Sequence, residues 1–188
     1  CTEGRIAGKA AVKYVKDNPD SISIEPQKIE QLKDKVFKPL KTFEESKGFS
    51  TRDEINPNYI RPNMFLRRLN KIMDEYVGGT STWYTTNKPS LEKGLEYLTM
   101  LKEDSEKLGA QDLHELLRAW ENYHRLWTAE DHLRHVLFRE ETRYPGYLYR
   151  SDFPKIDEVN WKVFVNSKWN VETNSWEMYK RPVIQIVP

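Results

Sequence analysis

The sequence contains very little cysteine, since Cys1 is the only one among 188 residues. A single cysteine excludes a disulfide within the chain and any cysteine-rich metal site. Long apolar runs are also missing, and none approaches the roughly 20 residues that a membrane-spanning helix needs. The start of the chain lacks the basic and then apolar regions of a secretory signal. We therefore expect a protein of the reducing cytoplasm without a membrane span.

An excess of either charge is absent as well, because 30 basic and 29 acidic residues leave a net charge of +1. This balance excludes the strong positive field that recruits nucleic acid or an anionic membrane. The sequence has no G-x-G-x-x-G or Walker A phosphate loop and no G-x-S-x-G nucleophile turn. It also has no initiator methionine, and a helix is predicted from almost the first residue. These absences favour a structural part cut from a longer protein, and no catalytic residue is predicted.

Aromatic residues are abundant, with six Trp, ten Tyr and seven Phe, and they give the chain ample area to bury. Apolar residues at helical spacing predict helices over residues 2–17, 26–46, 62 to the stop at Gly78-Gly79, 89–108 and 112–141. Pro39 is expected to kink or split the second helix. The last three helices are predicted to form an antiparallel bundle. Its core is expected to include, from the fifth helix, Leu113, Leu116, Leu117, Trp120, Tyr123, Leu126, Trp127, Leu133, Val136, Leu137 and Phe138.

The pattern changes after the fifth helix. Residues 160–167 alternate in the manner of a strand, and RPVIQIV (181–187) predicts a second strand. The intervening KWNVETN segment (168–174) is the expected turn of a C-terminal hairpin. The predicted fold class is therefore mainly α, a three-helix bundle with extra N-terminal helices and a C-terminal β-hairpin.

A metal site is not predicted, although all four histidines lie in the fifth helix. His132 and His135 are three residues apart and share a helix face. A di-metal bundle site needs a second Glu-x-x-His motif on another helix, and the sequence has none. Glu130, Asp131 and Glu140 could complete a metal site with this pair, but the histidines are interpreted by default as ordinary polar or half-buried residues.

The segment LFREETRYPGYLYRSDFPKIDEVNW (137–161) resembles the C-terminal region of the fumarate reductase and succinate dehydrogenase flavoproteins. That family has a Ser-Arg-Gly-x-His-x-Arg-x-Asp-[Phe/Tyr]-Pro motif, followed by an acidic pair and a tryptophan. Tyr144-Pro145-Gly146-Tyr147 replaces the Gly-x-His part here. The residues that match the motif are Arg143, Arg150, Asp152, Phe153, Pro154, Asp157, Glu158 and Trp161.

The Pro-Gly variant and the ending NWKVFVNSKWN…EMYKRPVIQIVP resemble a narrower family, the alpha subunits of dissimilatory adenylylsulfate reductases. Four further stretches resemble the same family in the same order along the chain: 2–12, 56–62, 73–87 and 112–135. This resemblance implies a subunit that binds FAD and reduces adenylylsulfate to sulfite and AMP, or runs the reverse reaction. It also implies an iron–sulfur beta subunit as the electron donor.

The resemblance places the dinucleotide fold and the catalytic residues upstream of Cys1, so FAD would be bound mainly by that missing part. The resemblance also implies that the N-terminus of helix 2–17 points toward the flavin, where it would stabilise negative charge on the reduced ring. Cys1 and Thr2 are therefore the cofactor-binding candidates. The implied segments are residues 1–20 as the last helix of the FAD domain, 21–60 as a connection, 61–142 as the helical bundle and 143–188 as the extended tail.

Two alternatives remain at this point. One is a related flavoprotein with another substrate, such as a dicarboxylate, and the other is a free-standing helical interaction module without enzymatic activity. The exposed aromatic residues expected at 83–84 and 144–149 suit either internal packing or contact with the iron–sulfur partner. The isolated chain is expected to fold poorly, because helix 2–17 would leave its small-residue face uncovered.

Overall fold

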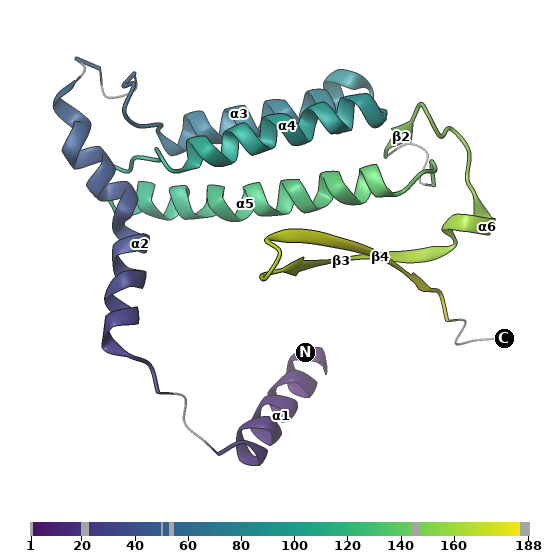
Figure 1. Cartoon of the computed structure of the whole chain (residues 1–188), viewed down its shortest axis with the longest axis horizontal. Helices are drawn as coiled ribbons and strands as arrows, with labels where there is room; N and C mark the ends of the chain where they lie inside the picture. The colour runs from purple at the N-terminus through teal and green to yellow at the C-terminus, as the bar shows by residue number, and fades with distance from the viewer. Residues whose placement is uncertain (1, 20–22, 50, 53–54, 144–146, 185–188) are drawn as a thin grey trace. The chain divides into compact units, whose positions relative to one another are not determined.

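The computed structural model of the chain describes residues 2–19, 23–49, 51–52, 55–143 and 147–184. The chain divides into two compact units, Cys1–Val36 and Phe37–Pro188 (Figure 1). Most described residues are helical, and one antiparallel strand pair lies near the C-terminus. The predicted fold class, a helical bundle with a β tail, is confirmed.

The first unit contains α1 (Thr2–Asp17) and the first half of α2 (Pro26–Ser46). Glu3 in the first turn of α1 and Lys16 in its last turn have the charges that the helix dipole favours. No residue of α1 is buried, and a Cβ added to Gly4 or Gly8 would have no neighbour within 4 Å. The helix therefore has good local signals but no core of its own.

Pro39 does not split α2, since the helix continues through it to Ser46. Proline lacks the N–H of one helical hydrogen bond, so tertiary contacts have to offset that loss. Pro39 and Phe43 are buried, and the Pro39 carbonyl accepts a hydrogen bond of 2.9 Å from Ala110 N. The Phe43 ring packs against Tyr59 with 5.2 Å between ring centroids. These contacts attach the second half of α2 to the larger unit.

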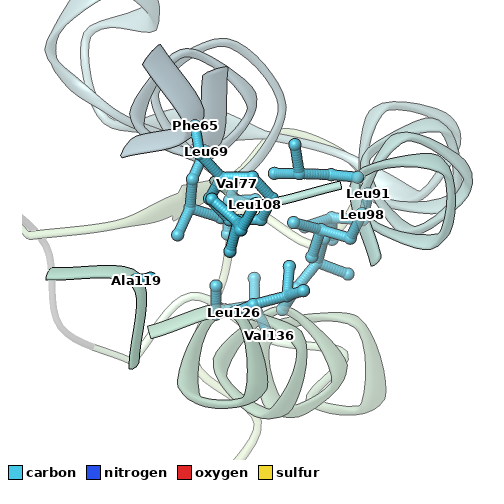
Figure 2. Close-up of a cluster of buried hydrophobic side chains, with 12 residues drawn as sticks. Phe65, Leu69, Val77, Leu91, Leu98, Leu108, Ala119, Leu126 and Val136 are labelled. Carbon is cyan, nitrogen blue, oxygen red and sulfur yellow. The ribbon is translucent and has the colours of Figure 1, made fainter. Parts of the chain in front are cut away.

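Three helices form the body of the larger unit: α3 (Pro62–Tyr76), α4 (Lys88–Ser105) and α5 (Leu113–Phe138). α3 starts at Pro62, as predicted, because proline suits the first turn of a helix. Asn87 and Asp112 cap α4 and α5, each accepting a backbone N–H with its side chain. Figure 2 shows the apolar side chains of the three helices meeting in one core, and its fully buried members include Phe65, Leu91 and Leu133.

The prediction of which face of α5 enters the core was partly wrong. Leu116, Leu126 and Leu133 are buried, but Leu113 is 70% exposed and Leu117 is 57% exposed. The helix has two apolar stripes, and the buried one packs against α3 and α4 in the bundle core. The buried residues of α5 are Leu116, Ala119, Asn122, Leu126, Ala129, Leu133 and Val136.

The connection between α3 and α4 is more ordered than the sequence indicates. It holds a short 3-10 helix (Thr80–Thr82) and strand β1 (Thr85–Thr86), which pairs in parallel with β2 (Tyr149–Arg150). A second 3-10 turn (Lys47–Phe49) follows α2. The β1–β2 pair joins the α3–α4 connection to the chain that leaves α5.

The C-terminal hairpin consists of β3 (Val163–Asn170) and β4 (Ser175–Pro182). Its second strand was predicted six residues too late, because the apolar run 183–187 hides the strand pattern before it. Asn170 accepts the backbone N–H groups of Glu172 and Thr173, and the turn (171–174) starts three residues later than expected and ends at the expected residue. Residues 185–187 of that prediction lie outside the described residues.

Aromatic side chains attach the hairpin to α5. The Trp127 ring meets Trp169 edge-on at 4.7 Å and lies 5.9 Å from Trp176. The Lys102 ammonium of α4 lies 4.4 Å from the centre of the Trp127 ring, within range of a cation–π contact. Trp127 itself is 38% exposed, so its contacts with the hairpin and Lys102 lie outside the bundle core. In the part of the chain that the structure describes, no helix is long and apolar enough to cross a membrane.

Candidate functional site

The residues of the flavoprotein-like motif gather at the C-terminal end of α5. Arg150, the second residue of β2, is 2% exposed. Its guanidinium donates to the carbonyls of Val136, at 2.5 Å, and of Arg139, at 2.9 Å. The last carbonyls of a helix have no helical partner, so this arginine closes the end of α5.

Asp152 completes the environment of Arg150. Its two carboxylate oxygens accept from Nε and Nη2 of Arg150 at 2.9 and 2.8 Å, a two-pronged pairing that only arginine provides. The same carboxylate accepts the backbone N–H of Lys88 at 2.9 Å, at the first residue of α4. The pair therefore connects the end of α5 to the start of α4.

Glu141 is the centre of the second part of the site, and its side chain is fully buried. It accepts from Nε of Arg143 at 2.6 Å, from Arg139, and from the backbone N–H of Asp157 at 2.9 Å. Arg143 reaches further, to Glu158, at 2.9 Å. We call Arg139, Glu141, Arg143, Arg150 and Asp152 the ion-pair cluster.

The other residues of the motif surround this cluster. Asp157 caps the short helix α6 (Glu158–Trp161) by accepting the backbone N–H groups of Val159 and Asn160. Trp161 is buried, and its ring meets Phe138 edge-on at 5.7 Å. Its carbonyl accepts a 3.0 Å hydrogen bond from Arg139. The motif is thus a set of connections between α5, α6 and the hairpin.

The hydrogen bonds of the cluster shift the pKa values of its carboxyl groups downward. The Arg150 hydrogen bond and the Lys88 N–H outweigh burial and lower the pKa of Asp152. Burial opposes the ionisation of Glu141, but hydrogen bonds from Arg143, Asp157 and Arg139 outweigh it and lower its pKa as well. Both carboxylates are therefore charged at neutral pH, which suits ion pairing and not proton transfer.

A cleft of about 430 Å³ lies beside the cluster, between the end of α5 and the hairpin. Half of the residues in its wall are apolar, among them Val136, Leu148 and Val165. The arginines on its rim, Arg139 and Arg143, both donate hydrogen bonds to the Glu141 carboxylate. Because these cations already have carboxylate partners, the cleft has the character of a packing surface.

A second feature with an unusual conformation is the loop before β1. Trp83 and Tyr84 have φ angles of 53° and 58°, a left-handed conformation that is uncommon for large residues. The Asp74 carboxylate holds this loop, because it accepts hydrogen bonds from the Ser81 N–H and the Thr80 hydroxyl. The hydrogen bonds from Ser81 and Thr80 lower the pKa of Asp74. Such strain, roughly 1–3 kcal/mol per residue, persists only where neighbouring contacts fix the backbone.

The predicted cofactor residues lie in the first unit. Cys1 is outside the described residues. Thr2 is the first residue of α1 and is exposed. The free amides of the first turn suit a negatively charged group, and Gly4 and Gly8 leave open space along one side of the helix. That Cys1 and Thr2 bind a cofactor therefore stays a prediction.

All four histidines lie on α5. Within the described ranges, no group of three His, Cys, Asp or Glu residues is placed to hold a metal ion. His135 lies 3.5 Å from Asp131, one helical turn away. Sequence reasoning missed Glu141, although an acid between two arginines in the run Arg139–Arg143 is a signal for an ion pair.

The chain is similar to known flavoproteins over its whole length. The family described as "Fumarate reductase flavoprotein C-term" matches residues 66–186. The adenylylsulfate reductase subunit alpha of Megalodesulfovibrio gigas is 48% identical over 186 residues, which are 99% of this chain and 28% of that protein.

Solved protein structures are also similar to this chain over its whole length. An adenosine-5-phosphosulfate reductase in complex with sulfite, as a covalent adduct, has a TM-score of 0.95 and 50% identity. The adenylylsulfate reductase of Archaeoglobus fulgidus has a TM-score of 0.94 and 50% identity. Each match covers 100% of this chain and 29% of the solved chain, so the chain spans less than a third of the length of these relatives. The family match includes the complete ion-pair cluster and well over half of the chain, which therefore belongs to the fumarate reductase flavoprotein C-terminal family.

Proposed function

We propose that this chain is the C-terminal part of the FAD-containing subunit of an adenylylsulfate reductase. The whole subunit would reduce adenylylsulfate to sulfite and AMP, or catalyse the reverse reaction, in the cytoplasm. The observation that carries the proposal is the 50% identity and TM-score of 0.95 along the complete chain to a reductase holding a sulfite adduct. A likeness of this degree over every element exceeds what a shared helical bundle alone would give.

Within that enzyme the chain has a supporting role. Three motif residues, Arg143, Arg150 and Asp152, form the ion-pair cluster together with Arg139 and Glu141. The cluster connects α4, α5 and α6, and its carboxylates all accept hydrogen bonds within the chain. FAD would be bound mainly by the preceding part of the subunit, and it would supply the redox chemistry. Residues 1–20 would be the last helix of the FAD domain, 21–60 a connection, 61–142 the bundle and 143–188 the tail.

The N-terminus of α1 would be the one part of this chain near the flavin. Its first-turn amides would stabilise negative charge on the reduced ring, with Cys1 and Thr2 nearest to it. The electrons would come from an iron–sulfur beta subunit. Adenylylsulfate, AMP and sulfite would bind to residues upstream of Cys1.

The experiment extends the chain upstream to its natural start and co-expresses it with the neighbouring ferredoxin-like gene. Bound FAD together with AMP-dependent sulfite oxidation would support the proposal. Bound FAD without this activity would point to another member of the flavoprotein family. A purified protein without flavin would contradict the proposal and favour an interaction module.

A further inference from the structure

We draw no further inference here: the strongest candidate, the exposed aromatic patch of Trp83, Tyr84, Tyr147 and Tyr149 beside β1 and β2, carries none, because nothing in the structure shows what covers it in a chain that spans less than a third of the length of its relatives.

Discussion

Glu141 and Arg143 are two residues apart and face each other through two hydrogen bonds, Nε to Oε1 at 2.6 Å and Nη2 to Oε2 at 3.0 Å. The glutamate side chain is fully buried, and the arginine side chain is 19% exposed. A carboxylate can be buried only when cations and N–H groups surround it, and Arg139 and the Asp157 N–H complete this set. The order of the chain after α5 depends on this pair.

Replacing Glu141 by Gln should destabilise the fold by about 3 kcal/mol, because it leaves two partly buried guanidinium groups without their carboxylate. Glu158→Gln is the matched control, since Glu158 also pairs with Arg143 but its side chain is 56% exposed. The control should lose about 0.5 kcal/mol. Urea unfolding followed by tryptophan fluorescence measures both values, and equal losses would contradict the central position of Glu141.

The stability of the protein should fall in acid because of the same cluster. Glu141 and Asp152 have pKa values below their ordinary 4.5 and 3.8, so the native state binds fewer protons than the unfolded state as the pH drops. Their contribution is therefore fully present above the ordinary values and is lost as pH falls through the lowered ones. Unfolding free energies between about pH 3 and pH 6 should decline less steeply in Glu141→Gln than in the unmodified chain. Parallel profiles would be evidence against a lowered pKa at Glu141.

Gly79→Ala should disturb the loop that carries Trp83. A Cβ at residue 79 would lie 2.5 Å from the Asp74 Cα, and backbone atoms cannot move aside cheaply. We expect a loss of about 2 kcal/mol, typical of overpacking. Gly48→Ala is the control, since a Cβ there has no neighbour within 4 Å, and it should leave Tm nearly unchanged. A thermal melt compares the two variants, and an unaffected Gly79→Ala would show that the loop is not tightly fixed.

The isolated chain should expose apolar surface through its first unit, because no residue of α1 is buried. A chain that begins at Phe37 keeps the complete bundle core and should melt as cooperatively as residues 1–188 while binding less of a dye for exposed apolar surface. A sharp melt of residues 1–188 without dye binding would contradict this expectation, since α1 would then have found a cover within the chain.

Local signals predicted the bundle well. Pro62 starts α3, and the Gly78-Gly79 pair ends it, since Gly78 has a φ of 93° and Gly79 approaches Asp74 closely. Where a helix starts or ends depends mainly on the type of one residue and its close neighbours in the sequence. Helix boundaries of this kind can therefore be predicted from residue types alone.

Features that join distant segments were not predictable from local patterns. The β1–β2 pair has two residues in each strand and connects residues 64 positions apart, as Thr85 pairs with Tyr149. The α5 sequence has two apolar stripes, and periodicity alone does not say which of them other helices cover; Leu113 and Leu117 proved to be exposed. The motif resemblance identified Arg143 and Arg150, whereas Glu141 became evident only when the fold placed Arg139, Arg143 and the Asp157 N–H around it.

The most direct test of a supporting rather than catalytic role compares the full-length enzyme with its Glu141→Gln variant. Both would be assayed for AMP-dependent sulfite oxidation per bound FAD and for the rate of thermal inactivation. The account predicts equal kcat per flavin and a clearly faster inactivation of the variant. A large loss of kcat per flavin at unchanged thermal stability would contradict it, because Glu141 would then contribute to the chemistry itself.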